Sequence, residues 1–312
     1  MEHPILQLDR VVKAYDRKIA VDGVTFDVPR ASIFGLLGPN GAGKTSLIRI
    51  ITTITQADSG KIFLDGEPLS SRHPDYIGYM PEERGLYKKM KVGEHILYLA
   101  RLKGLSKANA ETAVRHWFEK FGIMDWWGKK VEELSKGMQQ KIQFISTVLH
   151  RPKLLILDEP FSGLDPINAN LIKDEIEVLR QNGTSIIFST HRMEQVEEIC
   201  NTIVLINQGK NILEGGVADI RQQFKENLFR IDFQGTLPAG LPEKVVVVHS
   251  KPGAVTIQLP EGENSNALLR YLIDQGIGII AFQEILPSLN EIFIRQVNAF
   301  DAGARQSTSF ML

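Results

Sequence analysis

The sequence is short of cysteine, of long apolar runs and of an excess of charge of either sign. Its one cysteine, Cys200, excludes an internal disulfide. A net charge of −1 over 312 residues provides no basic field for nucleic acid, so no nucleic-acid partner is expected. The apolar runs, such as residues 277–282, fall far short of the ~18 residues that a membrane span needs.

The start of the sequence lacks a basic segment followed by a long apolar run, so no signal peptide is expected. Together these absences predict a soluble, cytoplasmic chain that relies on another polypeptide for any work at a membrane. The length of 312 residues suggests about two domains with a substantial core.

The most informative feature is a glycine-rich run between an apolar stretch and a helical pattern. Residues 38–45 fit G-x-x-x-x-G-K-[ST], the phosphate-binding loop of a nucleoside triphosphatase. The alternative is a tight glycine turn without a ligand, and the apolar stretch before the run and the helical pattern after it disfavour that alternative. Glycine lets successive N–H groups face the phosphates, and the following helix adds its positive end. Lys44 would reach the β- and γ-phosphates, and the Thr45 hydroxyl would bind Mg²⁺. The predicted nucleotide-binding residues are Gly38, Pro39, Asn40, Gly41, Ala42, Gly43, Lys44, Thr45 and Ser46.

An acidic pair ends a second apolar run, residues 154–157. Because a hard cation prefers carboxylate oxygens, Asp158 is predicted to hold Mg²⁺. Glu159 could accept a proton from the attacking water or polarise it. An isolated Asp-Glu pair would more readily be a solvated strand end or a helix cap. Downstream of a phosphate loop, it predicts the catalytic centre of a nucleoside triphosphatase, with Lys44 as a further catalytic residue.

Residues 134–140, Leu-Ser-Lys-Gly-Met-Gln-Gln, complete a set that resembles the ATP-binding cassette (ABC) ATPases. This run is similar to the family's signature segment, whose common form is Leu-Ser-Gly-Gly-Gln. The resemblance implies that Ser135 and the Gly137 N–H bind the γ-phosphate at the start of a helix. Lys136 and Met138 depart from the common form but leave the hydroxyl and the second glycine in place. Taken alone, the run would also fit a plain Ser-capped helix.

Three more residues stand where the family places contacts to nucleotide or to a second subunit. Tyr15, upstream of the phosphate loop, matches an aromatic that stacks on adenine, with a core tyrosine as the alternative. Asp165 ends residues 162–165, which resemble the D-loop that crosses the dimer interface. His191 follows an apolar strand, as the family's switch histidine does, and its ring could bind the γ-phosphate and hold Glu159 and the water. A lone histidine is otherwise more often structural.

Glu82 is the departure from the family pattern that matters most. After residues 77–81 the family usually has glutamine, which binds Mg²⁺ and links the site to the transporter. A carboxylate ligates Mg²⁺ at least as well as an amide oxygen, so Glu82 is predicted to keep the metal role beside Thr45 and Asp158. The variant run 81–87, with the extra C-terminal domain, resembles a subgroup that serves ABC-2-type exporters, including sodium-efflux systems.

The predicted fold is α/β, with a P-loop core of ABC type in residues 1–217. The resemblance implies an antiparallel β subdomain that carries Tyr15 and a helical subdomain over about 83–150 that carries the signature. Beyond residue 225, short strand patterns alternate with helical patterns at 266–274 and 289–297, which predicts an accessory α+β domain over 225–300. Residues 301–312 are small and polar and are predicted to be a disordered tail.

The resemblance implies a chain that binds and hydrolyses ATP with Mg²⁺. Two copies, or this chain and a homologous ATPase subunit, would meet head to tail with each ATP between Lys44 of one and Ser135 of the other. The dimer would drive membrane permease subunits on separate chains, with export expected, and would lie on the inner face of the cell membrane through them.

The alternative is a soluble ABC ATPase that acts on the ribosome or on DNA. Ribosome-bound members usually carry two cassettes and chromosome-type members insert a long coiled coil, whereas this chain has one phosphate loop and no such insert. The accessory domain could serve ligand sensing or dimerisation, and its sequence does not choose between them.

Overall fold

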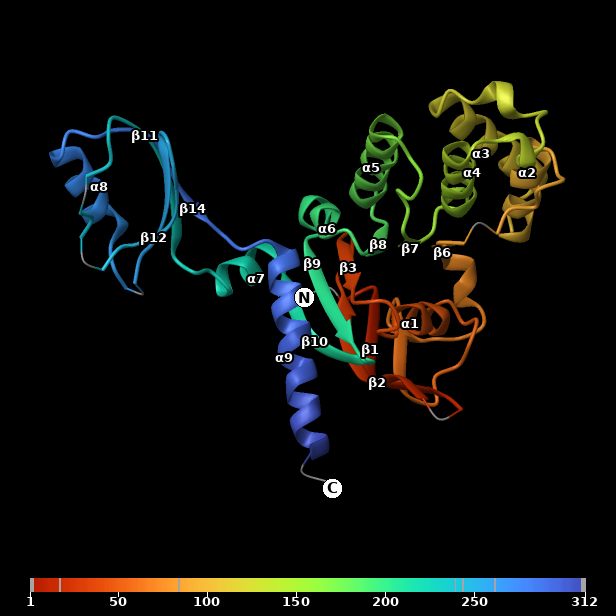
Figure 1. Cartoon of the computed structure of the whole chain (residues 1–312). Helices are drawn as coiled ribbons and strands as arrows, with labels where there is room; N and C mark the ends of the chain where they lie inside the picture. Colours follow the sequence, from red (N-terminus) through yellow and green to blue (C-terminus); the bar gives the residue numbers. More distant parts are fainter. Residues whose placement is uncertain are drawn as a thin grey trace. The chain divides into compact units, whose positions relative to one another are not determined.

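The computed structural model describes residues 3–309 apart from 17, 84, 239, 243 and 261 (Figure 1). Contacts divide the chain into two compact units. One unit is Met1–Gly216 together with Gln296–Leu312, and the other is Val217–Arg295.

A six-stranded sheet of order β10-β9-β3-β8-β7-β6 forms the centre of the first unit. Five of its strands run parallel, and β10 pairs antiparallel with β9 at one edge. The strands are β3 (Ile33–Leu37), β6 (Ile77–Met80), β7 (Leu154–Asp158), β8 (Ser185–Ser189), β9 (Thr202–Asn207) and β10 (Lys210–Gly216). The near-continuous apolar runs of β3, β7, β8 and β9 are buried, as expected of parallel strands covered on both faces.

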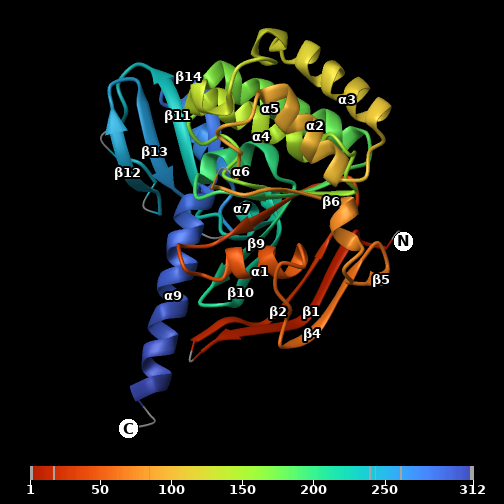
Figure 2. The ribbon, with the colours of Figure 1, turned by 90° about the vertical axis from the view of Figure 1, so that its right-hand side faces the viewer.

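An antiparallel sheet of order β2-β1-β4-β5 belongs to the same unit. It consists of β1 (Leu6–Tyr15), β2 (Lys18–Val28), β4 (Ser59–Leu64) and β5 (Glu67–Pro68). Helix α1 (Lys44–Ile51) lies between this sheet and the central one (Figure 2). Val24 of β2, Leu47 of α1 and Ile156 of β7 share one buried cluster, so the helix that follows the phosphate loop is held from both sides.

Helices cover the opposite face of the central sheet (Figure 2). They are α2 (Val92–Leu102), α3 (Lys107–Lys120), α4 (Lys136–Val148), α5 (Pro166–Gln181) and α6 (Met193–Ile199), with short 3₁₀ helices at His73–Tyr76, Met124–Trp126 and Val131–Glu133. Trp117 of α3 packs edge-on against Phe144 of α4, with ring centroids 6.2 Å apart. The end of α4 touches β6, where a Cβ at Gly78 would lie 2.6 Å from the Thr147 carbonyl oxygen. Helix α4 thereby connects the helical segment to the central sheet.

The second unit begins with α7 (Val217–Gln223) and contains an antiparallel sheet of order β12-β13-β11-β14. Its strands are β11 (Leu228–Gln234), β12 (Val246–Lys251), β13 (Ala254–Gln258) and β14 (Gly278–Ile285), and its second helix is α8 (Ser265–Asp274). Ile231 of β11, Val255 of β13 and Leu268 of α8 lie in one buried cluster. The unit has its own core and the α+β composition that its sequence pattern indicates.

The last helix, α9 (Leu289–Ser309), is longer than its sequence pattern indicates and has residues in both units. The predicted disorder of 301–312 is wrong for 301–309, which are helical, and 310–312 lie outside the described residues. The second unit also ends at Arg295 rather than at 300. The physical reason is a tertiary contact: the Asp301 carboxylate accepts hydrogen bonds from Asn207 and Gln208, at 3.1 and 2.9 Å.

Candidate active site

The predicted site residues of the core meet at one edge of the central sheet. Because β3, β6, β7 and β8 are parallel, the segments that follow their carboxyl ends lie together. These segments are the phosphate loop after β3, Glu82 after β6, Asp158 and Glu159 at the end of β7, and His191 after β8. Segments up to about 150 residues apart in sequence are thus brought to one place by the topology.

The phosphate loop needs glycine at two positions for lack of space. Gly38 has φ 152°, and a Cβ there would lie 2.2 Å from the Ile206 carbonyl oxygen. Gly43 has φ 111°, and its Cβ would lie 2.3 Å from the Ala20 carbonyl oxygen. A Cβ at Gly41 would meet nothing within 4 Å, so this side of the loop is open to a ligand. The loop is therefore a tight cradle with one open face.

The remaining loop residues follow around this cradle into α1. The Ala42 N–H donates to the Pro39 carbonyl at 3.1 Å, and Asn40 between them is exposed. Thr45 and Ser46 lie in the first turn of α1. Their backbone N–H groups belong to the helix end where a phosphate is favoured.

Lys44 is the cation of the site. Its Nζ donates to the carbonyl oxygens of Gly38 and Pro39 at 2.6 and 3.2 Å. Burial lowers the pKa of this ammonium, while the charges of Asp158, Glu159 and Glu82 raise it. The lysine is therefore within electrostatic reach of all three carboxylates.

Asp158 has an environment that calls for a cation. Burial raises its pKa above the ordinary value, the Ser189 hydroxyl lowers it, and the charges of Glu82 and Glu159 raise it further. Among the described residues no group of three or more His, Cys, Asp and Glu side chains is arranged to hold a metal alone. Mg²⁺ keeps few protein ligands and takes the rest from phosphate and water, so these residues fit a metal that arrives with a nucleotide.

Glu159 is held in a strained and well-defined position. Its φ of 51° is unusual for a residue with a Cβ, and its N–H donates to the Ser189 carbonyl at 2.9 Å. Its carboxylate accepts hydrogen bonds from the His191 N–H at 2.8 Å and the Thr190 hydroxyl at 3.1 Å, and it lies 2.7 Å from His191 Nδ1. The His191 ring is 69% exposed, so its far side faces solvent at this edge.

Two glutamines on α4 also support this edge, and the sequence analysis missed them. Gln143 donates to the Pro81 carbonyl at 2.7 Å, next to Glu82, and Gln140 donates to the Pro160 carbonyl at 2.9 Å, next to Glu159. Both side chains are buried. The sequence does contain a signal for them, because both glutamines lie on the apolar face of an amphipathic helix. An unpaired amide there would be costly, so each side chain is expected to have a hydrogen-bond partner.

The predicted signature and D-loop residues do not join this site within their own chain. Ser135 caps α4 by accepting from the Met138 N–H at 3.3 Å, and Asp165 caps α5 by accepting from the Asn168 N–H at 3.0 Å. A Cβ at Gly137 would lie 3.3 Å from the Gly163 carbonyl oxygen, so the two segments are neighbours. In the part of the chain that the structure describes, no hydrogen bond links Ser135 or Asp165 to the phosphate loop.

Tyr15 lies at the end of β1 with 41% of its surface exposed, so the alternative of a core tyrosine is wrong. The Lys13 ammonium lies 5.5 Å from its ring centroid, within the range of a cation–π contact.

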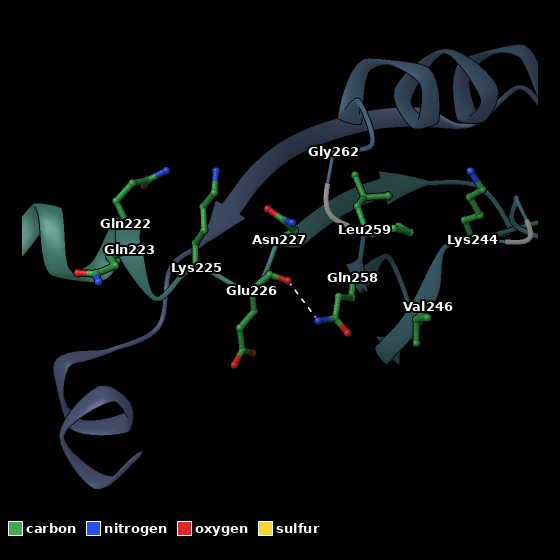
Figure 3. Close-up of a pocket in the computed structure, with 11 residues that line it drawn as sticks. Gln222, Gln223, Lys225, Glu226, Asn227, Lys244, Val246, Gln258, Leu259 and Gly262 are labelled. Carbon is green, nitrogen blue, oxygen red and sulfur yellow. Dashed lines mark hydrogen bonds between the residues drawn. The ribbon is translucent and has the colours of Figure 1, made fainter. Parts of the chain in front are cut away.

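A separate pocket of about 630 Å³ lies in the second unit (Figure 3). Its lysines are paired, Lys244 with Glu263 at 2.7 Å and Lys225 with Glu284 at 3.8 Å, and Gln258 donates to the Glu226 carbonyl at 3.2 Å. The residues predicted from sequence as site residues do not line it. The chemistry-bearing groups are those at the edge of the central sheet.

Comparison with known proteins finds family models over both parts of the chain. A family model described as ABC transporter matches residues 21–162, and a model described as the C-terminal domain of DrrA1-3-like ATP-binding proteins matches residues 215–297. A model described as an AAA domain of a putative AbiEii toxin also matches residues 130–195, which contain Asp158, Glu159 and His191.

Relatives extend the match over nearly the whole chain. The uncharacterized ABC transporter ATP-binding protein YhaQ of Bacillus subtilis (strain 168) is 44% identical over 297 residues, 95% of this chain and 99% of the relative. The Nod factor export ATP-binding protein I of Burkholderia thailandensis is 37% identical over 67% of this chain and 70% of its own. A solved structure of the ATP-binding subunit of an ABC transporter has a TM-score of 0.66 at 30% identity, and the match covers 70% of this chain and 93% of that one.

These similarities establish what the chain does. ATP-binding domains of this kind are ATPases coupled to transport and work with separate membrane permease components. The relatives give no support to the alternative of a soluble ATPase on the ribosome or on DNA. Within the described residues no helix is both long and apolar enough to cross a membrane. The chain, with its phosphate loop, acidic pair and C-terminal unit, belongs to the family of ABC transporter ATP-binding proteins.

Proposed function

We propose that each ATP binds with its phosphates on residues 38–45 of one chain and with its γ-phosphate against Ser135 and Gly137 of a second chain. The observation that carries this proposal is the grouping of Lys44 with the carboxylates of Asp158, Glu159 and Glu82. One ammonium among three anionic side chains suits a ligand that brings phosphate oxygens to the lysine and a cation to the carboxylates.

Thr45, Asp158 and Glu82 would hold the magnesium ion of the nucleotide. Mg²⁺ would offset negative charge on the phosphate oxygens. The support is the mutual repulsion of Glu82 and Asp158, which a divalent cation would relieve. If Glu82→Ala left both the rate of hydrolysis and its Mg²⁺ dependence intact, the role given to Glu82 would be wrong.

Hydrolysis would rest on Glu159 and His191 at the far end of the phosphates. The attacking water would donate a hydrogen bond to the Glu159 carboxylate, which accepts the proton as the water oxygen bonds to the γ-phosphorus. The bond between that phosphorus and the bridging oxygen breaks in the same displacement, and ADP leaves with the negative charge, which Lys44 and Mg²⁺ would offset. His191 would hold that carboxylate through Nδ1 and its backbone N–H, as it does at 2.7 and 2.8 Å. With both ring nitrogens protonated, Nδ1–H would donate to Glu159 and Nε2–H to an oxygen of the γ-phosphate, so one imidazolium ring would connect the phosphate to the base.

A second chain would complete the site. Ser135, Gly137 and Asp165 lie near one another but outside their own phosphate loop, which suits a two-fold dimer in which each chain completes the other's site. Tyr15, exposed beside Lys13, would stack on the adenine. Loss of the γ-phosphate would remove the bridge between the two chains, and the dimer would open.

The partner would be a membrane permease on a separate chain, contacted near Glu82 and the helical segment, and the subunit would lie on the inner face of the membrane through it. Export is the direction that we propose. It is supported by the Nod factor export protein among the relatives and by the match of residues 215–297 to the DrrA1-3-like domain.

The test is affinity purification of the Glu159→Gln chain from membranes in ATP and Mg²⁺, followed by mass spectrometry. Since the introduced amide cannot take the proton, ATP should stay bound, turnover should fall about 10²-fold or more, and a polytopic membrane protein should be recovered in stoichiometric amount. Lys44→Ala, treated identically, is the matched control because it should not retain ATP. Recovery of ribosomal or DNA-repair proteins without a membrane partner would contradict the proposed coupling to a permease.

A further inference from the structure

The turn between β9 and β10 has an unfavourable backbone. Its two central residues, Gln208 and Gly209, have φ of 47° and 79°, and Asn207 pairs with Lys210 on either side. Positive φ at both positions is the pattern of a type I′ hairpin turn, where Asn, Asp or Gly is preferred at the first position. Glutamine has a Cβ and gains no local compensation there, so the turn needs support from elsewhere.

This turn packs directly against the phosphate loop. The Gly209 N–H donates to the Ala42 carbonyl at 2.8 Å, and the Gly209 carbonyl accepts from the Asp22 N–H at 2.9 Å. The Ile206 carbonyl, just before the turn, fills the space where a Cβ at Gly38 would lie. A shift of the turn would therefore move the backbone that shapes the loop.

Asp301 of α9 supplies the missing support. Its Oδ1 accepts from Asn207 Nδ2 at 3.1 Å and from Gln208 Nε2 at 2.9 Å, so one oxygen fixes both side chains that lead into the turn. Asn207 is buried, with 4% of its surface exposed, so its amide would otherwise lack water. Both views show α9 running beside β10 (Figures 1 and 2).

We propose that Asp301 is a positioning residue for nucleotide binding. It acts through Asn207 and Gln208 on Gly209, which in turn holds the Ala42 carbonyl and keeps the phosphate loop in its binding shape. Because the contact pre-organises the loop, it affects the affinity for ATP rather than the chemistry at Glu159. The inference rests on the proposed assignment of residues 38–45 as the ATP phosphate site.

Linkage makes the effect reciprocal. If the Asp301 contact tightens ATP binding, ATP must stabilise the contact by the same factor. Hydrogen exchange in residues 296–305 of α9 should slow on addition of ATP. Helix α9 has residues in both units. Binding of ATP would therefore change the stability of a helix that the two units share.

The experiment compares full-length Asp301→Ala, Asp301→Asn and Asn298→Ala, the last being an exposed control on the same helix. Asp301→Ala should raise the Kd and KM for ATP about 3- to 10-fold, as expected for lost hydrogen bonds, with kcat within about twofold. Asp301→Asn keeps an acceptor at Oδ1 and should recover most of the affinity. Asn298→Ala should match the wild type, and Asn207→Ala combined with Asp301→Ala should be no weaker than Asp301→Ala alone.

An unchanged Kd for ATP in a folded Asp301→Ala would overturn the inference, as would a lowered kcat at constant KM or an additive loss in the double variant. Lys44→Ala separates this outcome from failure of the proposed site. If Lys44→Ala binds ATP as well as the wild type, the assignment of the phosphate loop fails. If only Lys44→Ala loses ATP, the assignment stands and the role of Asp301 is wrong.

Discussion

Asp158 shows, at the scale of one residue, a conflict between stability and function. Burial and the nearby Glu82 and Glu159 charges raise its pKa, although a cation needs the ionised form. A group whose pKa is higher in the folded than in the unfolded state binds more protons when folded. Its contribution to stability is therefore present at low pH and falls as pH rises through the folded-state pKa.

Asp158→Asn should therefore stabilise the nucleotide-free protein while stopping hydrolysis. The melting temperature should rise by about 2–4 °C at pH 8, with a smaller gain at pH 5, where Asp158 is closer to protonated. Calorimetry at the two pH values and a phosphate-release assay measure both effects. Asp174→Asn, on an exposed position of α5, should change neither. A lower melting temperature at pH 8 would show that the ionised Asp158 is not the destabilising form.

At the scale of elements, the phosphate loop depends on strands that it does not adjoin in sequence. Gly38 and Gly43 have no room for a Cβ because carbonyls of Ile206 and Ala20 occupy that space. The loop is thus shaped between β9 and β2, and its glycines serve packing as well as ligand access. A substitution there moves the surrounding backbone.

Gly38→Ala should lose ATP affinity and stability together. The added Cβ lies 2.2 Å from a backbone oxygen, so the loop or β9 must shift. We expect a loss of ATP affinity of about 100-fold and a fall in melting temperature that exceeds that of Gly66→Ala. Gly66 has φ 83° but nothing within 4 Å, so its substitution reports backbone strain alone, about 1 kcal/mol. If the two variants had equal effects on melting temperature and on ATP affinity, the clash between a Cβ at Gly38 and the Ile206 carbonyl would not be the cause of the loss.

At the scale of the whole molecule, the proposed assignment gives one chain two incomplete halves of a nucleotide site. The phosphate loop lies with Asp158 and Glu159, while Ser135 is bonded within its own helix. Two-fold symmetry offers the arrangement in which each half is completed by the partner. The second unit adds its own core, and α9 has residues in both units.

Mixing Lys44→Ala chains with Ser135→Ala chains tests this arrangement. Each variant alone forms dimers with two defective sites and should be nearly inactive. In a random mixture half of the dimers combine the two chains and contain one intact site, so about one quarter of wild-type activity should return if sites act independently. Steady-state hydrolysis after mixing measures this. Activity that stays at the average of the two variants would mean that Lys44 and Ser135 of the same chain serve one site.

The sequence by itself determined the chemistry of the core. The glycine spacing at 38–45 and the acidic pair after residues 154–157 are local patterns, each set by neighbours along the chain, and they led to the family that the comparisons show. The alternation of apolar strands and helices likewise predicted an α/β core, and the weaker patterns after 225 predicted a second, α+β unit.

Only the tertiary structure decided how distant segments support one another. It brought Glu82 within electrostatic reach of Asp158, attached the α4 glutamines to the segments after β6 and β7, and extended α9 through Ser309, where the sequence suggested disorder. It also joined Asp301 to a turn 94 residues earlier. Such contacts depend on burial and hydrogen bonding between segments far apart in sequence. Local residue preferences reflect only neighbours along the chain, so they cannot predict these contacts.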